Sequence, residues 1–75
     1  MPKLPRITSR KILAILLRAG FFVHHQVGSH VNLRHEIKTH LHVVIPRHGK
    51  DLSLKTLKSI LNQAELTPQE FKELL

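Results

Sequence analysis

The sequence predicts an α+β fold with the order α-β-β-β-α, in which a three-stranded antiparallel sheet carries two helices on one face, followed by a short C-terminal helix. The main observation is a change of period. Apolar residues recur at helical spacing in residues 9–19 and again after residue 53, whereas they alternate with polar residues between 21 and 46. An all-helical alternative would need helical periodicity in the middle segment, which this alternation does not provide. The other face of the sheet should therefore be open.

Length and charge limit the classes of function. Residues 1–75 are enough for a single domain, and the absence of cysteine excludes disulfides and thiolate metal sites. Twelve Lys and Arg against five Asp and Glu give a formal net charge of +7, which suits a polyanionic partner, although a plain solvated surface would explain it as well. The apolar run from Ile12 to Leu17 is too short for a signal sequence or a membrane span, so we expect a cytoplasmic protein.

The N-terminal part should be an extended leader followed by a helix. Residues 1–7 are basic and contain two prolines, which keep the backbone extended. Thr8 and Ser9 are both good N-caps for a helix over residues 9–19, and Gly20 offers a left-handed stop.

Three strands should follow. The first runs from Phe21 to Val27, and Gly28-Ser29 forms a turn into the second, which begins at His30. A polar stretch from His35 to Thr39 leads to the third strand, which covers residues 41–45 and is closed by Pro46.

Two further helices complete the predicted fold. Ser53 should cap the first of them, after a loop at 47–51 around Gly49, and Thr67 with Glu70 reads as a capping box for the second. Their expected apolar positions are Leu54, Leu57, Ile60, Leu61 and Ala64, then Phe71, Leu74 and Leu75.

The strand pattern also predicts which side chains face solvent. Because side chains two apart share a face, a core of Val31, Leu33, Leu41, Val43 and Ile45 places the intervening residues on the open face: His30, Asn32, Arg34, His40 and His42. The adjacent His24 and His25 should point to opposite sides of their strand, and we assign them no role.

His30 is the best-placed candidate for chemistry, because it follows the Gly28-Ser29 turn at the start of a strand. A ribonuclease without a metal needs a base, an acid and cations, and imidazole suits the first two tasks. His30 with His40 or His42, plus Arg34 or Lys38 as the cation, would be a sufficient set, but the second proton carrier stays unassigned because the sequence does not give the strand pairing. A solvated surface is the commoner role for Arg34 and Lys38.

Two other kinds of site are conceivable from the sequence, a metal site and a phosphate-binding loop. His40 and His42, with His30, have a spacing that some metal sites use, but no carboxylate or thiolate joins them, so we expect no metal and no cofactor. The loop residues Arg47, His48 and Lys50 are expected to bind phosphate, although Asp51 excludes a Walker-type loop.

Four segments in order are characteristic of a known family: Ala19-Gly20-Phe21, Gly28-Ser29-His30, Val43–Pro46 followed by His48-Gly49-Lys50, and Thr56–Leu61. From about Thr8 to Leu75 the chain resembles HicA. The resemblance implies a double-stranded-RNA-binding-like fold and the toxin half of a type II toxin-antitoxin pair, which cleaves mRNA. The family's functional histidine falls on His30.

The resemblance also implies a HicB-type antitoxin that covers the active face and commonly links the pair to operator DNA. We expect His30 to be catalytic, and RNA to be bound by Gly28, Ser29, Arg34, Lys38, Arg47, His48 and Lys50. Two alternatives remain: a non-catalytic module that binds RNA or DNA through the open face, and a subunit whose basic face serves only a protein partner.

Overall fold

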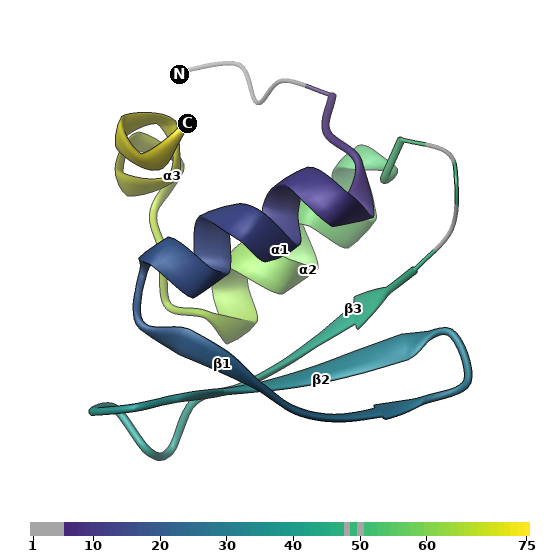
Figure 1. Ribbon diagram of the computed structural model, residues 1–75. Coiled ribbons are helices and arrows are strands. Elements are labelled where there is room, and N and C mark those ends of the chain that lie inside the picture. Colours follow the sequence, from purple (N-terminus) through teal and green to yellow (C-terminus); the bar gives the residue numbers. More distant parts are fainter. Residues whose placement is uncertain (1–5, 48, 50) are drawn as a thin grey trace.

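A computed structural model describes residues 6–47, 49 and 51–75 (Figure 1). Its elements follow the predicted order and confirm the α+β fold. They are α1 (Ser9–Arg18), β1 (Phe21–Val27), β2 (His30–His35), β3 (His42–Pro46), α2 (Leu54–Gln63) and α3 (Pro68–Leu74).

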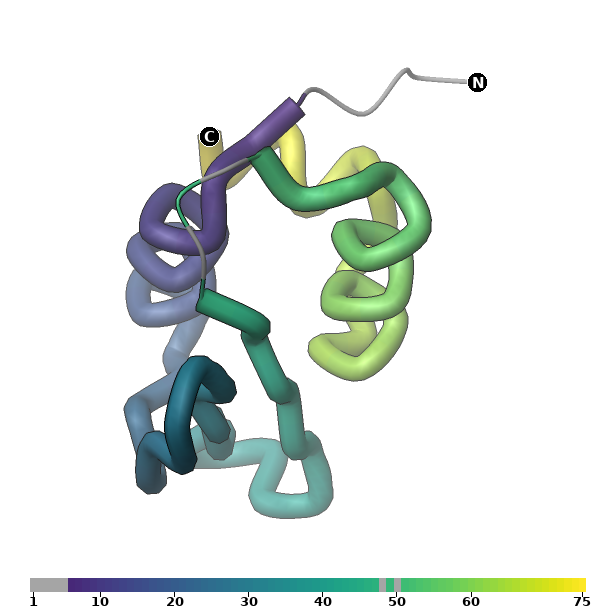
Figure 2. Tube along the Cα trace, turned by 90° about the vertical axis from the view of Figure 1, so that its right-hand side faces the viewer, coloured from purple at the N-terminus to yellow at the C-terminus, as the bar shows by residue number. Residues whose placement is uncertain are grey.

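The strands form an antiparallel sheet in the order β1-β2-β3, and α1 and α2 cover the same face of it (Figures 1 and 2). Helix α1 contacts β1 and β3, α2 contacts β3, and α3 packs against α1. None of the described helices is long and apolar enough to cross a membrane. Among the described elements no helix lies over the opposite face of the sheet, as the sequence predicted (Figure 1).

The core lies between the sheet and the helices. The predicted strand residues Val31, Leu33, Leu41, Val43 and Ile45 are all buried, which confirms the alternation in β2 and β3. The predicted apolar stripe of α2 is wrong at its N-terminal end, because Leu54 is 53% exposed. At the C-terminal end of α3, Leu75 is exposed as well. The helices contribute these buried residues: Ile12, Ile15, Leu16, Leu57, Ile60, Leu61, Ala64 and Phe71.

The start of the described chain is part of this core. Ile7 is 4% exposed, and its carbonyl accepts a hydrogen bond of 2.8 Å from the backbone N–H of Leu52. Thr8 and Asp51 form an isolated β-bridge beside it. The sequence placed Ile7 in an extended leader without a core role, and residues 1–5 of that leader lie outside the described part. Ile7 therefore ties the start of α1 to the segment before α2.

Each helix begins at a hydroxyl cap. The side chain of Thr8 accepts from the backbone N–H of Lys11, and that of Ser53 accepts from Thr56. At α3 the predicted capping box is present: Thr67 accepts from the N–H of Glu70 at 3.1 Å, and Glu70 accepts from the N–H of Thr67 at 3.0 Å. The backbone N–H and then the hydroxyl of Thr67 stabilise the carboxylate, which lowers the pKa of Glu70 below its usual value.

Strand β1 departs from the simple alternation. Its register with β2 shifts between Val23 and His25, and only Phe21 is buried. At this bulge the Nδ1 atoms of His24 and His25 lie 2.7 Å apart on the surface. The prediction that these neighbours point to opposite sides is wrong, because the bulge interrupts the period of two.

Candidate catalytic face and phosphate-binding surface

His30 is the first residue of β2 and is exposed. It lies in register with Val27 of β1 and with Pro46 of β3. The turn before it is tightly defined, because Gly28 has a φ of +57° and the Ser29 carbonyl accepts a 2.6 Å hydrogen bond from the N–H of Arg47. Since Val31 points into the core, the alternation of the strand directs His30 toward the open face.

The open face carries polar and basic side chains from all three strands. Asn32 and Arg34 follow His30 along β2, and the Nε2 atom of His42 lies 3.0 Å from the Oδ1 atom of Asn32, to which it donates. On β1, His25 is in register with Asn32. By register, His25, His30 and His42 therefore share the open face with Asn32.

These residues do not all gather at His30. Arg34 is in register with His42, and both lie four residues along the sheet from His30, a distance of about 13 Å. The closest second imidazole by register is that of His25, because its position is diagonal to His30, with Cα atoms about 7 to 8 Å apart in such pairs. Sequence reasoning missed His25 because the bulge that turns it to this face is not visible in the period.

His40 is not on this face. Its Nε2 atom lies 3.3 Å from the Oε2 atom of Glu65, which belongs to the connection between α2 and α3, and both side chains are more than half exposed. The prediction that His40 shares a face with His30 is wrong because β3 begins only at His42, so the alternation does not extend to residue 40. Lys38 lies in the β2–β3 connection, at the opposite end of β2 from His30.

No three His, Asp or Glu side chains within residues 6–47, 49 and 51–75 are grouped as a metal site would require. His40, whose spacing in the sequence groups it with His30 and His42, lies away from the open face beside Glu65.

His35 has a structural position that the sequence did not reveal. Its Nδ1 atom accepts from the backbone N–H groups of Ile37 and Lys38, which places the proton on Nε2, and this atom donates to the carbonyl of Ala19 at 3.0 Å. The ring also packs edge-on against Phe21. Both ring nitrogens are thus engaged, and His35 joins the α1–β1 connection to the β2–β3 connection.

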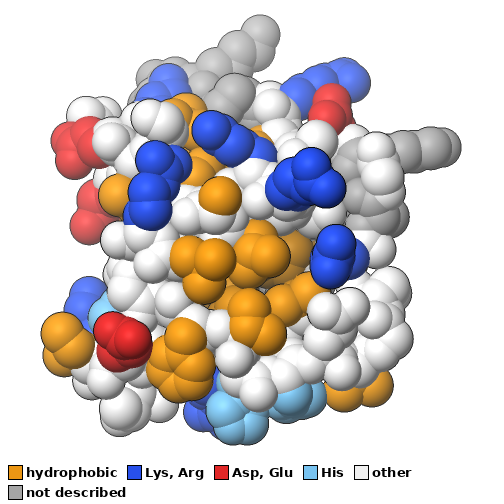
Figure 3. All heavy atoms as spheres, viewed as in Figure 1, with side chains coloured by type: hydrophobic (Ala, Val, Ile, Leu, Met, Phe, Trp, Pro, Cys, Tyr) orange, Lys and Arg blue, Asp and Glu red, His pale blue; other side chains and the backbone are white. Residues whose placement is uncertain are grey.

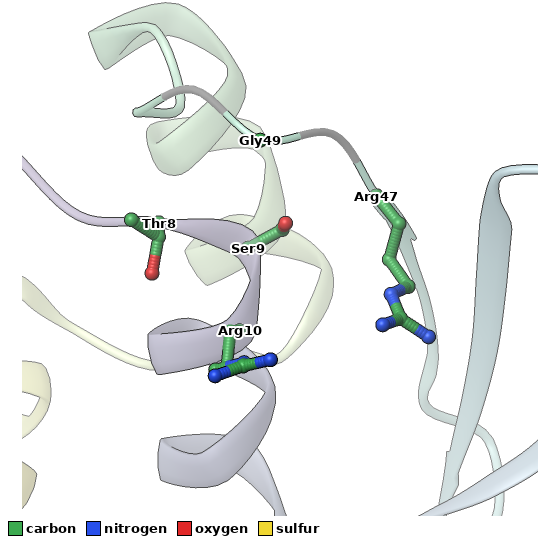
Figure 4. A pocket seen from close by; sticks show the side chains of 5 residues that line it. All are labelled: Thr8, Ser9, Arg10, Arg47 and Gly49. Atoms are coloured by element: carbon green, nitrogen blue, oxygen red, sulfur yellow. The ribbon is translucent and has the colours of Figure 1, made fainter.

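A cavity of about 510 Å³ lies between the start of α1 and the end of β3 (Figure 4). Arg47, predicted to bind phosphate, lines it, whereas His48 and Lys50 of the same loop lie outside the described residues. The cavity also brings in Arg10, which sequence reasoning missed because nothing in its helix indicates proximity to the β3–α2 loop. Its lining residues are Thr8, Ser9, Arg10, Arg47 and Gly49.

Basic side chains are spread widely over the surface seen in Figure 3, and acidic ones are few, in keeping with the net charge of +7. No curated protein matches the chain. A comparison with protein families matches residues 9–66 to the family described as HicA toxin of bacterial toxin-antitoxin. That match covers most of the chain, including the Gly28-Ser29-His30 turn and the β3–α2 connection, and the chain therefore belongs to the HicA toxin family.

Proposed function

We propose that this toxin is a metal-independent endoribonuclease that cleaves mRNA, with His30 as a general acid or base. The observation that carries the proposal is the position of His30, exposed at the start of β2 behind a turn that is hydrogen-bonded to the end of β3. Membership of a toxin family supplies the biological setting, in which the toxin is paired with an antitoxin.

The proposed reaction is an attack by a ribose 2′-oxygen on the adjacent phosphorus. A base takes the 2′-OH proton, the P–O5′ bond breaks, and an acid protonates the departing 5′-oxygen, so that the products are a 2′,3′-cyclic phosphate and a 5′-hydroxyl. Imidazole serves either proton transfer because it titrates near neutral pH, and such groups typically accelerate a reaction by about 100-fold to 10,000-fold.

A second proton carrier is needed if His30 performs only one transfer. His25 is the best placed by register, and His42 lies further along the sheet. We therefore expect His25→Ala to slow cleavage more than His42→Ala does. Equal rates for the two variants would remove His25 from the mechanism.

The remaining predicted residues serve RNA binding in this proposal. Backbone groups of Gly28 and Ser29 lie beside His30, while Arg34, Lys38 and Arg47 offer cations to phosphates, together with His48 and Lys50. A HicB-type antitoxin would cover the open face in the cytoplasm and would connect the pair to operator DNA.

The test is incubation of the purified chain with labelled single-stranded RNA in EDTA, beside His30→Ala and the matched control His40→Ala. We expect His30→Ala to retain its fold and RNA affinity while cleavage falls by about 100-fold or more. His40→Ala, which removes an imidazole paired with Glu65, should cleave at the parental rate. Cleavage by His30→Ala at that rate would refute the assignment.

A module that binds nucleic acid without catalysis is the second candidate. It is favoured by the basic composition, twelve Lys and Arg against five Asp and Glu, and by the sheet face that no described helix covers (Figure 1). It predicts intact RNA with both the parent and His30→Ala, together with a mobility shift that weakens as salt is added.

A further inference from the structure

We propose that the cavity between α1 and the end of β3 binds a phosphate group through Arg10 and Arg47. Where the phosphate belongs to RNA, this inference rests on the proposed function and adds a contact away from the bond that is cut. The same chemistry would accept a free phosphate, and the experiment below separates the two sources.

The geometry of the cavity supports a bound group of this size. Arg10 comes from the first turn of α1 and Arg47 from the residue after β3, so that the cavity has one arginine on its α1 side and one on its β3 side (Figure 4). Both side chains are exposed, so the gap is open to a ligand. A guanidinium group offers a planar fork of N–H donors that matches two phosphate oxygens.

The charge balance also points to an anion. Within the described residues the single ion pair is His40–Glu65, so neither guanidinium has a described carboxylate within 4.0 Å. Asp51 lies nearby through its bridge to Thr8, but it does not form an ion pair with either arginine. Two cations that share a cavity repel each other, and an anion between them converts that repulsion into attraction.

The cavity is separate from the candidate catalytic position, although both lie at the same end of the sheet. Pro46 is in register with His30, and Arg47 donates its N–H to Ser29. Because Pro46 shares the open side with His30, the alternation of β3 turns the next residue, Arg47, to the other side, where it lines the cavity beside α1. An RNA chain that reaches both must pass over the end of the sheet, so the cavity should affect affinity and leave the chemical step unchanged.

The first measurement is binding of a 2′-O-methyl RNA oligonucleotide, which has no free 2′-OH and so cannot be cleaved. We expect Arg10→Ala and Arg47→Ala each to weaken binding by about tenfold and to lower the slope of log Kd against log salt by about 0.7. The matched control is Lys11→Ala, which removes a neighbouring charge on the same helix outside the cavity lining, and it should weaken binding by about twofold or less. Because both arginines hold one group, the double variant should bind more tightly than the product of the two single effects predicts.

The second measurement is titration of ¹⁵N-labelled protein with inorganic phosphate. Shifts confined to the amides of Thr8, Ser9, Arg10 and Gly49, and abolished in Arg10→Ala, would support the site even if RNA does not compete for it, and would then assign it to a free phosphate. Competition by the oligonucleotide would assign it to RNA. Equal effects of Arg10→Ala and Lys11→Ala on RNA binding, with no phosphate-dependent shifts at these amides, would overturn the proposal.

These results do not depend on catalysis. If the parent fails to cut unmodified RNA, the proposed ribonuclease activity is refuted. Both binding measurements still test whether the cavity binds a phosphate group. If the parent does cut, Arg10→Ala should raise KM with kcat unchanged, whereas His30→Ala should lower kcat.

Discussion

At the scale of single residues, the surroundings of each histidine determine its use. His35 has both ring nitrogens engaged with backbone groups and its ring against Phe21, so it serves the fold. His30 is exposed, and no hydrogen bond to its ring is formed within the described residues, which leaves its nitrogens available to a substrate. The proximity of Gly20 to His35 makes the structural role testable.

Gly20→Ala should destabilise the protein by about 3 kcal/mol. Gly20 has a φ of +100°, and a Cβ atom there would lie 2.7 Å from the Nε2 atom of His35, displacing the ring from the carbonyl of Ala19. Urea denaturation measures the loss. The control is Gly28→Ala, where φ is +57° but the space is empty, and it should cost about 1 kcal/mol. Equal losses would show that His35 does not occupy this position in solution.

At the scale of elements, sequence reasoning succeeded where a local pattern determines the structure. Hydroxyl caps at Ser53 and Thr67 and the alternation of β2 fix their elements through neighbouring atoms, so their boundaries could be read from the sequence. The bulge in β1 and the late start of β3 depend on pairing with β2, which no local pattern encodes. The positions of His25 and His40 were missed for that reason, and the proximity of Arg10 to Arg47 depends on packing between distant segments.

The capping box of α3 predicts a pH dependence. Because the pKa of Glu70 is lowered in the folded protein, its ionised form contributes stability above the usual carboxyl pKa, and this contribution is lost as the pH falls through the lowered value. Glu70→Gln keeps a side-chain acceptor but does not titrate. Its stability should therefore fall less than that of the parent between about pH 5 and pH 3.

The measurement is thermal unfolding across that range. Glu73→Gln is the matched control, because it lies one turn further along α3 and outside the capping box. If Glu73→Gln flattens the pH dependence as much as Glu70→Gln does, the capping box is not the source of the effect.

At the scale of the whole molecule, the contact of Ile7 with the segment before α2 joins the two halves of the chain. The N–H of Leu52 donates to the carbonyl of Ile7, and both side chains are buried in the common core. The start of α1, one side of the cavity, is thereby held against the loop that carries its other side. The cavity thus depends on a contact between the segment before α1 and the segment before α2.

Ile7→Ala should lower the free energy of unfolding by about 2 to 4 kcal/mol, because it leaves a void in the core. The same substitution at Ile37, which is 84% exposed, should change stability by about 0.5 kcal/mol or less. Chemical denaturation compares the two variants. A similar small effect for both would mean that Ile7 does not pack in the core in solution.

The bulge in β1 has a consequence for self-association. As the outer strand of the sheet, β1 directs one row of backbone N–H and C=O groups away from β2, and such a row is a template on which another chain can add a strand. The shift between Val23 and His25 breaks the even spacing that continuous addition requires, and it does so in the middle of the strand. The irregularity at His24 and His25 therefore also makes β1 a poorer template for the addition of a strand from another chain.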